Sequence, residues 1–197
     1  SVWQSMATLI FIGVMTFLPL KVVGAESAYD CGTIPCDTFE ADPSDKPSLQ
    51  RGAALYANYC MGCHSLQYSR HNRVASDLGI PEDLYKANLI FDPEIKLGSL
   101  MSNSMDKGDA KVWFGATPPD LTLISRARQP EWLYTYLRAF YQDDLRPYGV
   151  NNRVYPNVGM PHVLMELQGL AACSDEAGVA AAKAEQCVTM DVASAGA

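Results

Sequence analysis

Two cysteines and a histidine stand together in the sequence CMGCH, at Cys60, Cys63 and His64. Two thiols three positions apart lie on one turn of chain and can reach two neighbouring vinyl groups of a haem. The histidine that follows is then carried beneath the iron. The C-x-x-C-H pattern is therefore typical of a covalently attached c-type haem, with His64 as an axial ligand.

Three other kinds of site use paired cysteines. A thioredoxin-type redox pair follows a strand and opens a helix, whereas this pair is expected to close one. A zinc site needs a second pair of ligands, and the remaining cysteines and histidines offer no further C-x-x-C or closely spaced histidine pair. A plain disulfide between Cys60 and Cys63 would leave His64 without a role. Haem attachment is the interpretation that uses all three residues.

An electron-carrying haem needs a sixth ligand, and a methionine opposite a histidine raises the reduction potential. Met160 lies between Gly159 and Pro161, where the backbone is stiff and no helix constrains the side chain. Met165 falls on an expected helical face, where methionine more often packs in a core. The context favours Met160 without excluding the other candidates, which are Met101, Met105, Met165, Met190, His71 and His162.

The propionates of a haem are anionic and need basic or hydrogen-bonding partners. Arg126 and Arg128 follow the PPDL sequence closely, and a planar guanidinium can bind a carboxylate through two hydrogen bonds. The alternative is that both arginines are a solvated surface pair.

The elements that must position these residues are mostly helices. Ser48 is expected to cap a helix that ends at Cys60, and Pro81, as the first helical residue, opens another with acids in its first turn. No strand of more than four alternating residues stands out, so an all-α fold with long irregular loops at 92–120 and 145–160 is expected. Long loops are reasonable where a large rigid ligand replaces part of the core. The expected helices are 49–60, 81–90, 130–142, 162–168 and 174–187.

Charge and the N-terminal residues narrow the functional class. The 197-residue chain has 22 acidic and 15 basic residues, a net charge of −7 and a pI of about 4.9, which argues against a nucleic-acid partner.

Residues 6–20 are uncharged and small residues follow at 23–25, so residues 1–25 are expected to be a cleaved signal peptide, with an uncleaved anchor as the alternative. With either a signal peptide or an anchor, the rest of the chain is expected to cross a membrane. Residues 26–48, rich in Asp and Pro, read as an irregular acidic arm.

Three blocks of the sequence resemble the cytochrome c1 family, the haem-bearing subunits of the respiratory quinol–cytochrome c reductase. Residues 51–80 contain CMGCH, residues 111–141 contain GATPPDL, and residues 146–164 contain NVGMP. Simple soluble cytochromes share only C-x-x-C-H, so the second and third blocks make the resemblance specific. The three blocks resemble the bacterial members of the family. The resemblance implies a cytochrome c-like haem domain over residues 49–197 that holds one covalent haem c.

The resemblance also implies roles for individual residues. Cys60 and Cys63 match the thioether cysteines, His64 matches the proximal iron ligand, and Met160 matches the distal ligand. Arg128 matches the arginine that contacts a haem propionate, and Arg126 is its near neighbour. Pro118 and Pro119 match a segment that lies close to the haem.

For function, the resemblance implies a redox subunit with no independent catalytic site. Such a subunit takes electrons from the Rieske iron–sulfur protein and passes them to a soluble or membrane-bound cytochrome c. It stands beside cytochrome b on the periplasmic face of the bacterial inner membrane. A free periplasmic mono-haem carrier and a haem-based gas-binding module are the alternatives.

Two features of the chain depart from the family pattern. Family members end in a transmembrane helix, and nothing after Met165 has that character, so a fragment truncated at both ends and lacking its membrane anchor is expected. Four cysteines are left over after haem attachment and allow three pairings. Because export favours oxidation, local pairing is expected, as Cys31–Cys36 and Cys173–Cys187.

Overall fold

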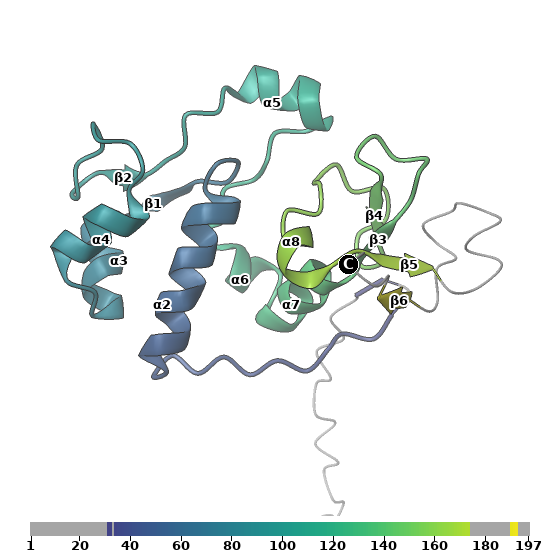
Figure 1. Ribbon diagram of the computed structural model, residues 1–197, viewed down its shortest axis with the longest axis horizontal. Helices are drawn as coiled ribbons and strands as arrows, with labels where there is room; N and C mark the ends of the chain where they lie inside the picture. The colour runs from purple at the N-terminus through teal and green to yellow at the C-terminus, as the bar shows by residue number, and fades with distance from the viewer. Residues whose placement is uncertain (1–30, 33, 174–189, 193–197) are drawn as a thin grey trace, which may run out of the picture.

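The computed structural model describes residues 31, 32, 34–173 and 190–192, which form two groups of elements with one helix above them (Figure 1). Most elements are helices, as expected, but two small sheets accompany them, so the fold is helical with a few strands rather than purely α. The helices are α2 (Lys46–Leu55), the π-helix η1 (Tyr56–Cys60), α3 (His71–Leu78), α4 (Glu82–Leu89), α5 (Lys107–Phe114), α6 (Ile124–Ala127), α7 (Pro130–Arg138) and α8 (Met165–Gln168). The strands are β1 (Leu66–Arg70), β2 (Leu100–Met101), β3 (Phe140–Gln142), β4 (Val150–Asn152), β5 (Ala171–Cys173) and β6 (Met190–Val192).

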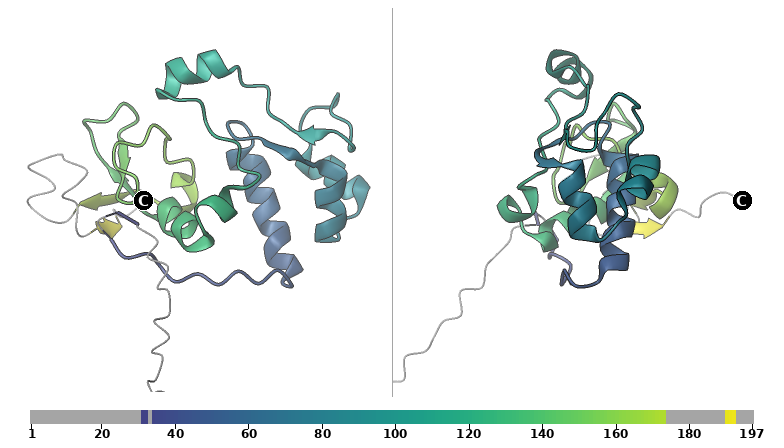
Figure 2. Two further views of the ribbon diagram at one scale, coloured as in Figure 1. Left: turned by 180° about the vertical axis from the view of Figure 1, so that it is seen from behind. Right: turned by 90° about the vertical axis from the view of Figure 1, so that its left-hand side faces the viewer.

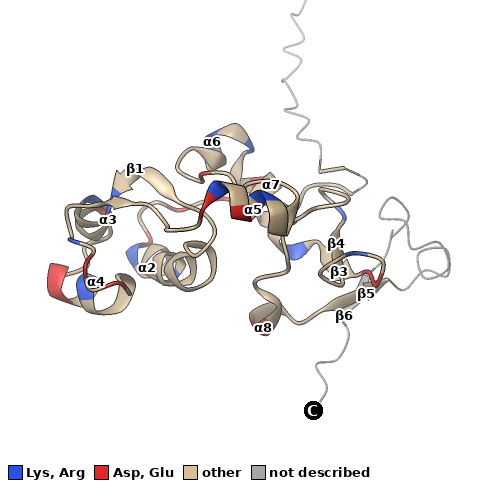
Figure 3. Cartoon of the chain, turned by 90° about the horizontal axis from the view of Figure 1, so that it is seen from above, with Lys and Arg blue, Asp and Glu red and all other residues tan. Residues whose placement is uncertain are grey.

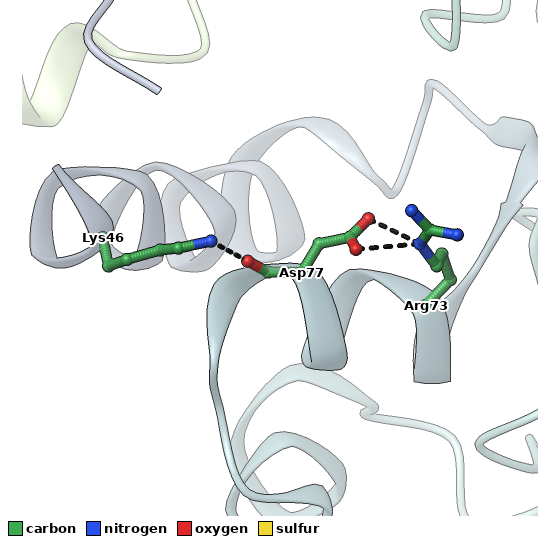
Figure 4. A network of polar contacts seen from close by, with 3 residues as sticks. All are labelled: Lys46, Arg73 and Asp77. Atoms are coloured by element: carbon green, nitrogen blue, oxygen red, sulfur yellow. Dashed lines mark hydrogen bonds and ion pairs between the residues drawn. The ribbon is translucent and has the colours of Figure 1, made fainter. Parts of the chain in front are cut away.

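The first group packs α2, α3 and α4 around a small apolar cluster of Ala57, Ala75, Tyr85 and Leu89. Antiparallel pairing of β1 with β2 closes the group on one side. Polar contacts at the surface add to it: Lys46 at the start of α2 donates to the carbonyl of Asp77, which is itself paired with Arg73 at 2.8 Å (Figure 4).

The predicted helix starts in this group need two corrections. Ser48 does not cap α2, because the Asp45 carboxylate accepts the Ser48 N–H at 3.0 Å and the helix begins at Lys46. Pro81 is the N-cap of α4 rather than its first residue, although Glu82 and Asp83 do occupy the first turn. Both differences move a boundary by one to three residues and leave the helix in place.

The second group packs α7 against a four-stranded sheet of order β4-β3-β5-β6. The predicted helix 130–142 is wrong at its end: α7 stops at Arg138, and Phe140–Gln142 turns into β3, which pairs antiparallel with β4. The predicted helix 162–168 is reduced to α8, which begins at Met165. Phe140, Val150 and Val158 form the apolar cluster of this group.

Helix α5 stands above both groups in the views from the front, back and side (Figures 1 and 2). It lies inside the stretch predicted as loop, 92–120. The helix forms because Asp106 caps it by accepting the N–H groups of Gly108 and Asp109, and Gly115 ends it with a left-handed φ of +78°.

The acidic arm is fastened to the second group before it reaches α2 (Figure 1). Cys31 and Cys36 form the expected disulfide, and Cys31 is buried against Ala139 and Val154. Asp37 accepts a hydrogen bond from Arg138 at 2.7 Å. The arm is therefore packed over its first described residues rather than merely covering the surface.

Several predictions concern residues outside the described part of the chain. They are the signal peptide at 1–25, the first residues of the arm, the helix at 174–187 and the cysteine Cys187. Within the described residues, no helix is both long and apolar enough to span a membrane.

Candidate functional site

The two cysteines of CMGCH lie where α2 has passed into the wider turn of η1. Cys60 is the last residue of η1, and its carbonyl accepts the N–H groups of Cys63 at 3.1 Å and His64 at 2.8 Å. The pair thus closes a helix, as predicted. Both thiols are free, so the plain disulfide is not what the structure contains. Burial raises the pKa of both thiols, and the neighbouring Cys63 raises that of Cys60 further, so both are protonated at neutral pH.

The imidazole of His64 is held from one side only. Its Nδ1 lies 2.7 Å from the carbonyl oxygen of Pro119, which can only accept, so Nδ1 carries the proton. In the neutral imidazole, Nε2 then carries a lone pair and has no hydrogen-bond partner among the described residues. Histidine binds a metal in this form. On the backbone side, the Tyr56 hydroxyl donates to the His64 carbonyl at 2.5 Å.

Asp120 fixes the segment that carries Pro119, a role that sequence reasoning missed. Its carboxylate accepts the backbone N–H of Gln67 at 2.7 Å and that of Thr122 at 3.0 Å. Partial burial would raise the pKa of this carboxyl, but these hydrogen bonds outweigh it and the pKa is lowered. Asp120 therefore stays ionised and ties the segment beside β1. Its position directly after two prolines was the only signal in the sequence.

A cleft of about 370 Å³ opens beside Cys63. Pro118 and Pro119 line it, so the structure brings these two predicted residues together with the cysteine. Met105 also lines it. No protein atom lies within 4 Å of where a side chain on Gly62 would begin, so the turn itself leaves space open.

Met160 belongs to the second group, in the irregular stretch after β4. The Tyr136 hydroxyl donates to its sulfur at 3.3 Å, and burial raises the pKa of that hydroxyl, which keeps it protonated. A Cβ on Gly159 would lie 2.3 Å from the carbonyl oxygen of Phe114, so only glycine lets α5 approach so closely. Half-buried and partnered through its sulfur, Met160 is a constrained side chain, as its sequence context indicated.

The alternative ligands differ in their surroundings. His71 is fully buried in the first group beside Tyr85. His162 stacks on Phe140 at 4.9 Å, with its Nε2 3.1 Å from the carbonyl oxygen of Gly169. Both histidines are thus packed in their own groups. Among the candidate methionines, Met101 is buried, Met165 is about half exposed, and Met105 lines the cleft.

The two predicted arginines lie on the exposed side of the short helix α6 and just after it (Figure 3). The Arg128 guanidinium lies over the Trp132 ring, 4.9 Å from its centre. The Arg126 guanidinium has no hydrogen-bond or ion-pair partner among the described residues, and its backbone N–H donates to the Leu123 carbonyl at 3.1 Å. Neither arginine lines the cleft beside Cys63.

The described residues contain no group of three or more His, Cys, Asp or Glu side chains that could hold a metal ion. What the site offers instead is a pair of free thiols, one oriented imidazole and a constrained thioether.

Comparison with known proteins finds one matching family and relatives with two different names. The Cytochrome C1 family model matches residues 39–192. A cytochrome c1 of Allochromatium vinosum is 59% identical over 133 residues, which are 68% of this chain and 54% of that protein. A protein of Nitrosomonas europaea named ammonia monooxygenase gamma subunit is 48% identical over 136 residues (69% and 57%), and a cytochrome c1 of Rhodospirillum rubrum is 29% identical over 118 (50% and 43%). The chain spans about half the length of the curated relatives it matches.

Proposed function

The chain belongs to the cytochrome c1 family, and from that premise we propose that it carries electrons through one covalently attached haem c. Cys60 and Cys63 would form the two thioethers, and His64 and Met160 would be the axial ligands. A haem iron, when bound, supplies one-electron chemistry by alternating between its ferric and ferrous states.

The observation that carries the proposal is the state of the CMGCH turn. Its two cysteines are free thiols at the end of a helix, and thioether formation requires a reduced thiol, whose sulfur and hydrogen add to the two carbons of a vinyl group. The carbonyl of Pro119 orients the imidazole of His64 and leaves Nε2 available. Free thiols and an oriented imidazole on one turn support a c-type haem at this site.

Two prolines and two arginines are given further roles in the proposal. Pro118 and Pro119 border the space beside Cys63, and Pro119 also orients the proximal histidine. Arg128, with Arg126 as its neighbour, is proposed to pair with a propionate. The Arg126 guanidinium has no hydrogen-bond or ion-pair partner within the described residues and so is available to such a group.

The assembly proposed for the whole protein is the quinol–cytochrome c reductase. In it the haem domain, residues 49–197, would face the periplasm. It would receive electrons from the Rieske iron–sulfur protein beside cytochrome b and deliver them to a cytochrome c. The names of two relatives support this assignment. Export by residues 1–25 and a membrane anchor beyond the haem domain belong to the same proposal.

The name of the Nitrosomonas relative favours a second candidate assembly, a monooxygenase complex. The two assemblies use the same haem domain and differ in the partner proteins. Purification of the tagged full-length protein from its membranes separates them, because cytochrome b and the Rieske protein accompany it in one case and monooxygenase subunits in the other.

The proposal is tested by three spectra of the purified holoprotein. The reduced protein denatured in pyridine must show a haem bound through two thioethers. The oxidised native protein must show the methionine-to-iron charge-transfer band. The reduced protein must refuse carbon monoxide, because binding would indicate an open position and a gas-binding module.

Met160→Leu is expected to keep the haem attached, to abolish the charge-transfer band and to lower the reduction potential substantially. Met105→Leu is the matched control, because Met105 is the candidate methionine that lines the cleft beside Cys63. A band that survives in Met160→Leu and vanishes in Met105→Leu would reassign the distal ligand. Substitution of His64 is expected to abolish stable low-spin haem.

A further inference from the structure

Two adjacent asparagines in β4, Asn151 and Asn152, are almost completely buried, with 1% and 0% of their surface exposed. Burying an amide without hydrogen-bond partners costs free energy, so a buried pair indicates a network that satisfies both. Among the described residues, neither asparagine is hydrogen-bonded to Met160. Their partners lie in the backbone that leads to it.

Asn152 joins two segments that flank the methionine. Its side-chain oxygen accepts the N–H groups of Val154 at 2.9 Å and Tyr155 at 3.1 Å, at the start of the Met160 stretch. Its side-chain nitrogen donates to the carbonyl of Tyr136 in α7 at 2.8 Å. The hydroxyl of the same tyrosine donates to the sulfur of Met160. One amide thus fixes both the loop that carries the sulfur and the residue that binds it.

Asn151 extends the network toward the middle of the stretch. Its oxygen accepts the N–H of Asn157 at 2.8 Å, and its nitrogen donates to the buried carboxylate of Asp143 at 2.8 Å. Asp143 in turn accepts the N–H of Leu145 at 3.1 Å. The acceptor and donor atoms of the amide are therefore both used.

Arg146 holds the residues immediately before Gly159 from the outside. Its guanidinium donates to the carbonyl of Asn157 at 2.9 Å and to that of Val158 at 3.4 Å. Asn157 has a φ of +62°, a left-handed conformation that is uncommon outside glycine and that asparagine adopts more readily than most residues. Side chains, rather than a strand ladder or a helix, determine the path of the chain up to Met160.

We propose that Asn151 and Asn152, with Arg146, are positioning residues that hold the sulfur of Met160 in place for iron. The inference rests on the proposed function, in which Met160 is the distal ligand. Removing the amide of Asn152 leaves the N–H groups of Val154 and Tyr155 without their acceptor. It also takes one of two donors from the Tyr136 carbonyl, which keeps the N–H of Ala139, and so loosens the link between the loop and α7. Met160 is then no longer held at a fixed distance, and its bond to iron is the first feature to be lost.

The test compares Asn152→Ala and Arg146→Lys with matched controls in the full holoprotein. Asn88→Ala is the control for the first, because Asn88 is exposed and its amide makes one local bond to the carbonyl of Leu84. Arg73→Lys is the control for the second, since Arg73 is exposed and, within the part of the chain that the structure describes, its guanidinium pairs with Asp77 of the same helix, α3 (Figure 4). Each variant is examined for haem attachment, the charge-transfer band, the reduction potential and carbon monoxide binding.

Asn152→Ala is expected to retain two thioethers, to lose the charge-transfer band, to bind carbon monoxide when reduced and to have a lowered potential. Arg146→Lys is expected to weaken the band in the same direction, and it decides the question if Asn152→Ala does not fold. Both controls should match the parent protein. A band and potential that persist in both test variants would overturn the inference. A parent protein without the band would instead overturn the ligand assignment in the proposed function.

Discussion

The hydrogen bond from Tyr136 to the sulfur of Met160 gives the sharpest quantitative prediction. The donor and acceptor are 3.3 Å apart, and the tyrosine ring stacks on Trp132 at 5.1 Å and meets Phe140 edge-on at 5.5 Å. Tyr136→Phe keeps the ring contacts and removes only the hydroxyl. A hydrogen bond draws electron density from the thioether and so stabilises the electron-rich ferrous state. Its loss must therefore lower the reduction potential.

The size of the shift follows from the value of one neutral hydrogen bond, about 0.5–1.5 kcal/mol. For a one-electron couple, 59 mV corresponds to a tenfold change in the equilibrium constant, or about 1.4 kcal/mol. If the full bond were present in the ferrous state only, the potential would fall by about 20–65 mV. Sulfur is a weak acceptor, so the lower half of that range is expected.

The assay is a redox titration of the parent protein and Tyr136→Phe under identical conditions. Tyr134→Phe is the control, because Tyr134 is on the same helix, stacks on Phe39, and its hydroxyl has no hydrogen-bond partner among the described residues. The charge-transfer band must persist in both variants for the comparison to report on the hydrogen bond. A potential that stays unchanged or rises in Tyr136→Phe, with the band intact, would refute the reasoning.

Three further predictions concern the stability of the fold. Gly159→Ala places a Cβ 2.3 Å from the backbone carbonyl oxygen of Phe114. The variant should therefore be less stable than the parent by about 1–3 kcal/mol in urea denaturation, and its charge-transfer band should be weaker. A variant as stable as the parent would contradict this contact. Replacing Cys31 and Cys36 together by serine should lower the free energy of unfolding by about 2 kcal/mol, as expected for a disulfide that closes so short a loop. An unchanged free energy of unfolding under oxidising conditions would count against the disulfide. Burial lowers the pKa of His71, which faces Tyr85, so the unfolded chain binds the proton more tightly than the folded one. The free energy of unfolding should therefore keep its full value above about pH 6.5 and fall as the pH is lowered below it. Substituting His71 by Gln should flatten that decline, and an identical pH profile would assign it to other groups.

The chemistry of the first ligand was readable from the sequence because the motif is local. Cys60, Cys63 and His64 lie on one turn, and the helix before them carries its own start and end signals. The exact start was missed because Asp45 and Ser48 are both acceptable caps, and only the packing of Lys46 against α3 distinguishes them. Local signals therefore predicted the presence of the helix and placed its start three residues late.

The parts that were not predicted depend on contacts between distant residues. The pattern of α7 continues without a break into Phe140 and Tyr141, so nothing local signals the change to β3. The change is imposed by pairing with β4, ten residues later. Asn151, Asn152 and Asp120 likewise look like ordinary loop polar residues, and their importance comes from the backbone groups they satisfy once buried.

The division of the core explains why the second ligand depends on so much polar support. In the described residues the apolar clusters stay within one group or the other, and none joins the two. The groups meet instead through hydrogen bonds, such as Leu121 to the Ser65 carbonyl at 2.9 Å, and through α5, where the Tyr148 hydroxyl donates to the Trp113 carbonyl at 2.6 Å. His64 belongs to the first group and Met160 to the second, so apolar packing between the groups cannot set their separation. Asn152 and Tyr136 instead fix the position of the sulfur within the second group, and Gly159 allows the close contact with α5. Substitution of Asn152 or Tyr136 is therefore expected to act on ligation before it acts on folding.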